Sequence, residues 1–195
     1  MKKILLVIDP QNDFIWGSLA VDGAREAIKK LALSLASDRI YDQVIITADM
    51  HPDNHCSFIE NGGQWPAHCV RHTEGCQINS QLRSVVDVLY PGKYLILDKG
   101  LDAEREEYSI LKNATSMKRL LPFINDADEI HICGIAGDFC VLETVKDLVR
   151  LGYGSKIVLL WDFIAHTDKG YALTDLTDKE KLSWESTLTG RVNFE

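Results

Sequence analysis

A chain of 195 residues, 46% hydrophobic and 26% charged, is long enough to bury a sizeable core, which excludes a disordered or disulfide-stapled chain. We expect residues 1–195 to form a single domain. The 21 basic and 29 acidic residues give a formal net charge of −8, which argues against nucleic-acid binding, since that needs a basic surface. The longest apolar runs are strand-sized, so we expect no membrane span, no signal peptide and a cytoplasmic location.

Short, continuously apolar runs predict the strands, because a strand covered on both faces of a parallel sheet lacks polar alternation. These runs span residues 3–9, 43–49, 93–98, 129–134 and 156–162. Apolar spacings of three and four favour helices over residues 24–37, 78–89, 115–124 and 138–151. A last helix is predicted over 174–189 and an edge strand over 191–194. This alternation predicts an α/β fold with a doubly wound, mostly parallel six-stranded sheet and helices on both faces.

Reactive side chains lie where several of these strands end. Ligands of open α/β sheets bind outside the carboxyl ends of the strands, and Asp9, Lys99 and Cys140 all lie there. The start of a helix favours a thiolate, so Cys140 is a candidate nucleophile. A small buried core residue is the alternative interpretation. The other four cysteines have no such setting, and the odd total of five predicts no disulfide framework.

Residues 50–75 form a long segment without apolar periodicity that contains four of the six histidines. A loop of this length inside a domain is usually functional. Asp49, His51 and His68 provide one carboxylate and two imidazoles, a set that suits Zn²⁺ or a similar divalent ion and leaves positions open for substrate. A turn or a surface pair is the alternative. Spacing does not decide whether His55 or His72 competes as a ligand.

Aromatic side chains accompany these elements. They could form the walls of a pocket for a flat ring, and ordinary packing explains each one equally well. The four are Phe14, Trp16, Trp65 and Tyr108.

Several motifs resemble those of one enzyme family. The string DPQNDF at residues 9–14 and the string GIAGDFC at residues 134–140 resemble the motifs of the isochorismatase-like cysteine hydrolases, and Lys99 is similar to the lysine of that family. Within that superfamily, DMHPDNHCSF at residues 49–58 and WPAHCV at residues 65–70 resemble the metal-binding segments of nicotinamidases. The resemblance fades after Trp161, where residues 162–166 lack the usual small-residue turn.

The resemblance implies roles for particular residues. It makes Asp9, Lys99 and Cys140 a catalytic triad. It assigns one divalent metal ion, Zn²⁺ with Fe²⁺ or Mn²⁺ as alternatives, to Asp49, His51 and His68. It implies pocket contacts with the substrate ring and carboxamide from Phe14, Trp65, Tyr108, Ala136 and Gly137.

The implied reaction is hydrolysis of nicotinamide to nicotinate and ammonia through a thioester. Backbone N–H groups of Gly137 and Cys140 are expected to hold the oxyanion, and a non-proline cis peptide is expected between Ala136 and Gly137. Two other functions stay open: another amidase or ureidohydrolase of the superfamily, and a non-catalytic module that binds a metal or a partner. The sequence does not decide whether the chain forms a homo-oligomer.

Overall fold

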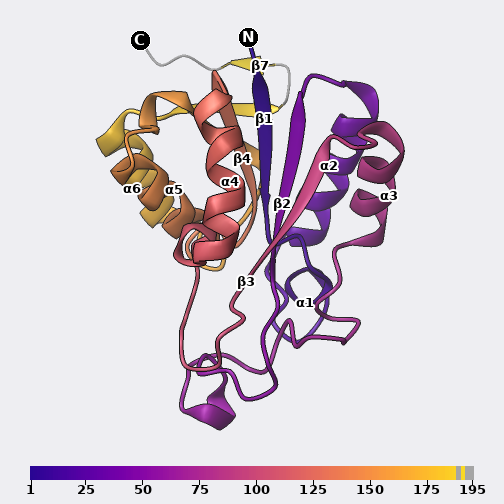
Figure 1. Cartoon of the computed structure of the whole chain (residues 1–195), viewed down its shortest axis with the longest axis vertical. Coiled ribbons are helices and arrows are strands. Elements are labelled where there is room, and N and C mark those ends of the chain that lie inside the picture. Colours follow the sequence, from indigo (N-terminus) through magenta and orange to yellow (C-terminus); the bar gives the residue numbers. More distant parts are fainter. Residues whose placement is uncertain (188–189, 192–195) are drawn as a thin grey trace.

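The strands form one sheet in the order β3-β2-β1-β4-β5-β6-β7 (Figure 1). The computed structural model describes residues 1–187 and 190–191. The strands are β1 (Lys3–Ile8), β2 (Gln43–Asp49), β3 (Tyr94–Lys99), β4 (Glu129–Ile135), β5 (Ile157–Ala165), β6 (Ser183–Thr187) and β7 (Gly190–Arg191). Strands β1 to β6 pair in parallel, and β7 is a two-residue antiparallel addition to β6. The six-stranded parallel sheet is confirmed.

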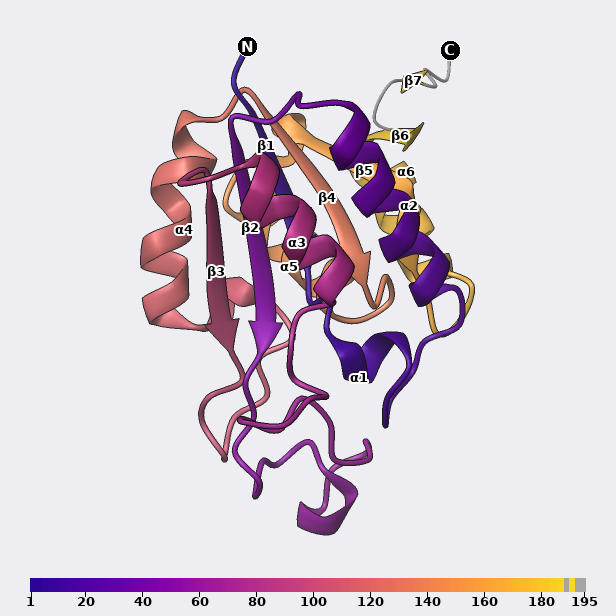
Figure 2. The same ribbon diagram turned by 90° about the vertical axis from the view of Figure 1, so that its right-hand side faces the viewer.

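Helices cover both faces of the sheet, as predicted (Figure 1, Figure 2). One face carries α2 (Ala24–Ser37) and α3 (Ser80–Leu89), and the other carries α4 (Ala114–Asp126), α5 (Cys140–Arg150) and α6 (Tyr171–Glu180). The connections include the short α1 (Asn12–Ile15) and three single-turn helices, Ile59–Asn61, Ile110–Lys112 and Gly154–Lys156. Within the described part of the chain, no helix has both the length and the apolar character to cross a bilayer.

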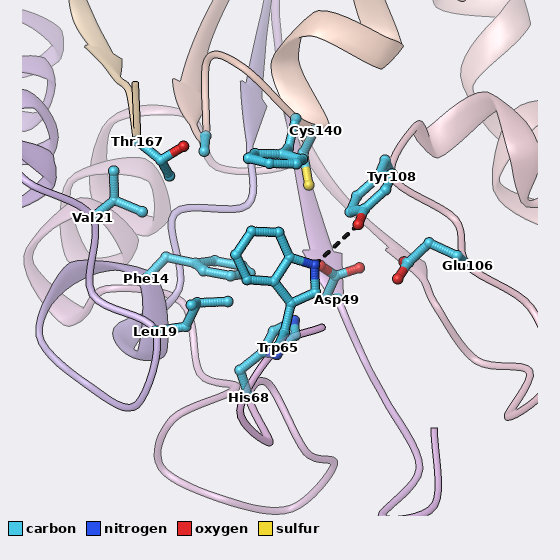
Figure 3. Close-up of a pocket in the computed structure, with 12 residues that line it drawn as sticks. Phe14, Leu19, Val21, Asp49, Trp65, His68, Glu106, Tyr108, Cys140 and Thr167 are labelled. Carbon is cyan, nitrogen blue, oxygen red and sulfur yellow. Dashed lines mark hydrogen bonds between the residues drawn. The ribbon is translucent and has the colours of Figure 1, made fainter. Parts of the chain in front are cut away.

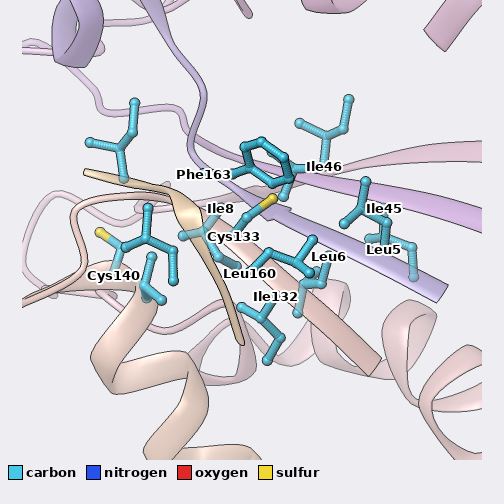
Figure 4. Close-up of a cluster of buried hydrophobic side chains, with 14 of the residues drawn as sticks. Leu5, Leu6, Ile8, Ile45, Ile46, Ile132, Cys133, Cys140, Leu160 and Phe163 are labelled. Atoms are coloured by element: carbon cyan, nitrogen blue, oxygen red, sulfur yellow. The ribbon is translucent and has the colours of Figure 1, made fainter. Parts of the chain in front are cut away.

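Covering both faces buries the central strands, which explains their continuous apolar runs. Every residue from Ile4 to Ile8 is fully buried. Figure 4 shows apolar side chains of β1, β2, β4 and β5 packed together, with Cys140 at the border of this cluster. The nucleophile candidate therefore lies at the border of a closely packed core.

The order of the strands places a crevice at one edge of the sheet. The chain passes from β1 outward to β2 and β3, then returns to pair β4 with the other side of β1. Ligands bind outside the carboxyl ends of strands at such a reversal. Asp9 follows β1, Cys140 begins the helix after β4, and Asp49 pairs in register with Lys99 at the ends of β2 and β3. The long segment after β2 extends beyond this edge (Figure 1).

The C-terminal part differs from the prediction. The helix expected over 174–189 ends at Glu180, after which Lys181 adopts a left-handed backbone with φ 52°. Residues Ser183–Thr187 then form β6 beside β5, so the sixth parallel strand lies earlier than the predicted 191–194. Pairing with β5 overrides the local helical spacing, and Trp184 and Thr187 favour strands. Residues 192–194 lie outside the described part of the chain.

The segment that departs from the family motif is also regular. Strand β5 continues to Ala165, beyond the predicted end at residue 162, with a register shift against β4 between Ile132 and Gly134. Most of residues 162–166 is therefore strand.

Candidate active site

Lys99 lies at the centre of a buried polar cluster at the crevice. Its Nζ is 2.9 Å from Asp9 Oδ2, 2.6 Å from Asp49 Oδ1 and 3.6 Å from Cys140 Sγ. Burial disfavours the charge on Lys99, but the two carboxylates outweigh burial and raise the pKa of Lys99 well above its ordinary value. A permanent positive charge therefore lies among the three acidic groups. The fold brings together all three residues of the expected triad.

Asp9 is held in an unusual backbone conformation with φ 45°, which is rare for a residue other than glycine. Its N–H donates to Thr47 Oγ1 at 3.2 Å, and the Thr47 hydroxyl donates to Asp9 Oδ1 at 2.6 Å. Burial raises the pKa of Asp9, and Lys99 and Thr47 only partly oppose this effect. Asp9 is therefore a stronger base than an exposed carboxylate.

Cys140 is the first residue of α5. Its Sγ and one oxygen each of Asp9 and Asp49 all lie within 4.8 Å of one another. Burial raises the pKa of the Cys140 thiol well above its ordinary value, although Lys99 opposes the shift. A thiol of this kind needs a nearby base before it can attack, and Asp9 is in place to serve.

The turn between β4 and α5 presents two backbone N–H groups close to Cys140. Among the described residues, neither the N–H of Ala136 nor that of Cys140 has an acceptor. The N–H of Gly137, by contrast, donates to the Ala165 carbonyl at 2.7 Å. The expected oxyanion donor at Gly137 is therefore wrong, because β5 already occupies it, and Ala136 is the available donor.

Asp49, His51 and His68 form a compact set, with one ligand atom of each within 4.8 Å of the others. The Nδ1–H of His51 donates to the Gly100 carbonyl at 3.0 Å, and that of His68 donates to the Pro66 carbonyl at 2.8 Å. Carbonyls only accept hydrogen bonds, so each Nδ1 carries a proton and each Nε2 is the ring nitrogen left to bind a metal ion. Such outer contacts are typical of metal-binding histidines. The three side chains therefore fit a divalent metal ion.

The other two histidines of this segment are not part of the set. His55 accepts the Ser57 N–H at Nδ1 (3.2 Å) and donates from Nε2 to the Arg105 carbonyl at 3.1 Å, so both ring nitrogens are used. Burial and the neighbouring His51 lower the pKa of His55 to about 4. His72 is exposed to solvent. The structure thus separates the three candidate ligands from their two sequence neighbours.

An aromatic pocket opens above the cluster (Figure 3). Its empty space is about 430 Å³, a volume that includes open solvent at the mouth. The Trp65 indole N–H donates to the Tyr108 hydroxyl at 3.0 Å, and both rings pack against Phe139, with ring centroids 5.0 and 5.6 Å away. Asp49, His68 and Cys140 lie on the same lining.

Most of the predicted pocket residues are in place. Phe14, Trp65, Tyr108 and Ala136 line the pocket, whereas Gly137 does not. A Cβ on Gly137 would lie 2.1 Å from His166 Nδ1, so Gly137 packs against the end of β5. Trp16, 45% exposed, is also absent from the lining. The cis peptide joins Ile135 to Ala136, one bond earlier than expected.

Five lining residues were not anticipated. Phe139 is next to Cys140 within the GIAGDFC string, and this position was an available signal. The remaining four come from loops that only the fold brings together, and they are Leu19, Val21, Glu106 and Thr167.

Two polar residues of the DPQNDF string hold the metal segment in place. The Gln11 amide donates to the carbonyls of Asp49 (2.7 Å) and Cys76 (2.8 Å) and accepts the Asp49 N–H at 2.8 Å. Asp13 Oδ2 accepts the N–H of Cys69, the residue after His68, at 2.7 Å. This string therefore supplies Asp9 and also fixes the backbone beside two candidate ligands.

Comparisons with known proteins agree with this geometry. Residues 3–171 match the isochorismatase domain family. The chain is 32% identical to a nicotinamidase of Saccharomyces cerevisiae, over 80% of this chain and 86% of the relative. It is similar to the crystal structure of the pyrazinamidase of Pyrococcus horikoshii in complex with zinc, with TM-score 0.79, 28% identity, and 95% and 99% of the two chains covered.

A second structure, PnC1 of L. infantum in complex with nicotinate, has TM-score 0.80 and 28% identity, and the match covers 94% of this chain and 92% of that one. The family match covers most of the chain, and the site has the cysteine, aspartate and lysine that the family motifs lead one to expect. The protein therefore belongs to the isochorismatase family.

Proposed function

We propose that the protein hydrolyses nicotinamide to nicotinate and ammonia, with Cys140 as the nucleophile. The observation that carries this proposal is the buried cluster of Asp9, Lys99 and Cys140 beside three candidate metal ligands. Cys140 and two of those ligands, Asp49 and His68, line an aromatic pocket. The relatives named nicotinamidase and the structure holding nicotinate support the same substrate.

The first step forms the bond between Cys140 Sγ and the carboxamide carbon. Asp9 accepts the thiol proton, and the charge of Lys99 stabilises the thiolate at 3.6 Å. The π electrons of the carbonyl move to its oxygen, which is held by the N–H groups of Ala136 and Cys140. Each such donor typically contributes about 3–4 kcal/mol to the transition state.

The second step breaks the bond between the carboxamide carbon and its nitrogen. Asp9, now protonated, gives its proton to the leaving ammonia, and a thioester to Cys140 remains. Asp9 then takes a proton from an entering water, whose oxygen attacks the thioester carbon. The bond between the carbon and Cys140 Sγ then breaks, nicotinic acid leaves and ionises to nicotinate, and the thiolate of Cys140 recovers its proton from Asp9.

We also propose that Asp49, His51 and His68 bind one Zn²⁺ ion, with Fe²⁺ or Mn²⁺ as alternatives. When bound, such an ion supplies an open coordination position for a pyridine nitrogen. The walls formed by Phe14, Trp65 and Tyr108 would hold the ring flat and point its carboxamide at the sulfur.

The remaining proposals concern the protein as a whole. One continuous sheet supports a single domain over residues 1–195. The net charge of −8 supports a small-molecule enzyme without nucleic-acid partners. We also propose a cytoplasmic location without membrane partners.

Release of ammonia and nicotinate from nicotinamide tests the function. Zinc-loaded protein should release both in equal amounts, and Cys140→Ala should release neither. Cys133→Ala is the matched control, because Cys133 is a fully buried core cysteine on β4 and should leave the reaction intact. A folded, zinc-loaded protein without product would contradict the proposal and direct the search to other small amides.

A further inference from the structure

Glu107 carries a buried carboxylate that the proposed chemistry leaves unused. Only 4% of the residue is exposed. Its Oε2 accepts the Gly100 N–H at 2.9 Å and the Asn113 side-chain amide at 3.1 Å. Its other oxygen lies 3.8 Å from the guanidinium of Arg105, a side chain that is 56% exposed. Burying a carboxylate is costly unless hydrogen bonds compensate, so these contacts define what the group does.

Gly100 connects Glu107 to the candidate metal site. It follows Lys99 directly, and its carbonyl accepts the Nδ1–H of His51 at 3.0 Å. Its φ of +65° is accessible to glycine, and a Cβ there would lie 2.4 Å from the His51 ring. The ring therefore rests against the Gly100 backbone. The position of Gly100 therefore helps to set where His51 Nε2 points.

The far end of this chain of contacts is anchored in α4. Asn113, which donates to Glu107, caps α4 by accepting the Ser116 N–H at 3.0 Å. The Ser116 hydroxyl donates to the Asp98 carbonyl of β3 at 2.6 Å. The first turn of α4 thus holds the end of β3 at two points, one of them through Glu107.

We propose that Glu107 is a positioning residue for the metal site. By holding the Gly100 N–H, it fixes the carbonyl that orients His51 toward the ion. The inference deepens the proposed function, since it rests on Asp49, His51 and His68 binding a divalent metal. Loss of a contact made directly to a ligating histidine typically weakens metal affinity about 10–100-fold, and Glu107 acts one contact further out, through Gly100, so we expect the lower end of that range.

Two conservative variants separate the hydrogen bond from the charge. Glu107→Gln loses the charge but keeps an oxygen at the distance of the Gly100 N–H. Glu107→Asp keeps the charge, but its side chain is one methylene shorter, so the carboxylate oxygen no longer reaches the Gly100 N–H. We expect the zinc dissociation constant, measured by chelator competition without substrate, to rise about tenfold for Glu107→Asp and to stay near wild type for Glu107→Gln. Arg105→Ala removes only the exposed partner and should also stay near wild type.

Three results would overturn the inference: unchanged zinc affinity in Glu107→Asp, equal weakening in both Glu107 variants, or a wild-type protein that binds no zinc. Thermal unfolding of the metal-free proteins is measured alongside, and equal midpoints in the two variants would show that the affinity difference is not a loss of folding. Zinc binding is measured without nicotinamide. Failure of nicotinamide hydrolysis is therefore distinguishable from failure of this inference.

Discussion

Replacing Lys99 with methionine removes the charge at the centre of the site while keeping much of the side-chain length. Lys99 is fully buried and pairs with Asp9 at 2.9 Å and Asp49 at 2.6 Å. Breaking a buried ion pair by removing one partner typically costs about 3–5 kcal/mol, because it leaves a buried charge uncompensated. Two carboxylates lose their partner here, so we expect the upper part of that range at neutral pH.

The stability lost in Lys99→Met depends on pH, in a direction that the structure determines. In the wild-type protein, burial raises the pKa of Asp49, but Lys99 and His51 outweigh burial and hold it below its ordinary value. This contribution to stability is present above the ordinary carboxyl pKa and is lost as pH falls. Without Lys99, burial and the neighbouring Asp49 raise the pKa of Asp9 further, and the pKa of Asp49 rises because only His51 still opposes burial. The Lys99→Met variant therefore becomes more stable relative to wild type as pH falls. The difference in the free energy of unfolding between the two proteins narrows.

The assay is thermal unfolding of metal-free protein at pH 8 and pH 5. A loss of 3–5 kcal/mol lowers the Tm of a chain of this size by roughly 6–20 °C. The matched control is Lys112→Met, since Lys112 is 46% exposed, lies 3.3 Å from Asp147 and should cost at most about 1 kcal/mol. Equal Tm values for the two variants, or a difference that widens on acidification, would refute the reasoning.

Three further predictions concern catalysis. Thr47→Val removes the hydroxyl that lowers the pKa of Asp9, so the acidic limb of the pH profile of kcat/KM should move to higher pH. Thr47→Ser keeps the hydroxyl and should leave that limb in place. An unmoved limb in Thr47→Val argues against Asp9 as the base. Tyr108→Phe leaves the Trp65 indole without its acceptor, which costs about 1 kcal/mol and should raise KM about fivefold at unchanged kcat. A matching fall in kcat would instead mean that the hydroxyl acts in the transition state. His68→Ala should abolish tight zinc binding in a chelator-competition assay, and chelation of the wild-type protein should lower kcat/KM; unchanged kinetics would exclude the proposed orienting role of the metal.

The central cluster was predictable because a parallel sheet gathers the carboxyl ends of its strands at one edge. Asp9, Asp49 and Lys99 each lie at such an end, and the register of β2 and β3 pairs the last two directly. Cys140 could be placed from the glycine-containing turn before its helix. The strand-end residues needed only element order, which short apolar runs reveal well.

Other parts of the site depend on contacts between distant segments. The exclusion of His55 as a ligand comes from the Arg105 carbonyl, which lies 50 residues away in sequence. Gly137 is removed from the oxyanion site by the Ala165 carbonyl of β5. Neither contact leaves a local pattern in the sequence.

The C-terminal error has a similar origin. The apolar spacing after residue 174 is compatible with a longer helix, but the exposed edge of β5 offers backbone partners to residues Ser183–Thr187. A free strand edge is a property of the assembled sheet, so local spacing could not reveal that this segment pairs there.

The most direct test of the central claim is whether Cys140 attacks a carbonyl carbon held in the aromatic pocket. Pyridine-3-carboxaldehyde labelled with ¹³C at the aldehyde carbon lacks a leaving group, so attack should stop at a thiohemiacetal that NMR can observe. We expect the labelled carbon to move from the aldehyde region to that of a tetrahedral carbon in the wild-type protein and in Cys133→Ala, and not in Cys140→Ala. The same tetrahedral signal in Cys140→Ala, or its absence from zinc-loaded wild-type protein, would contradict Cys140 as the nucleophile.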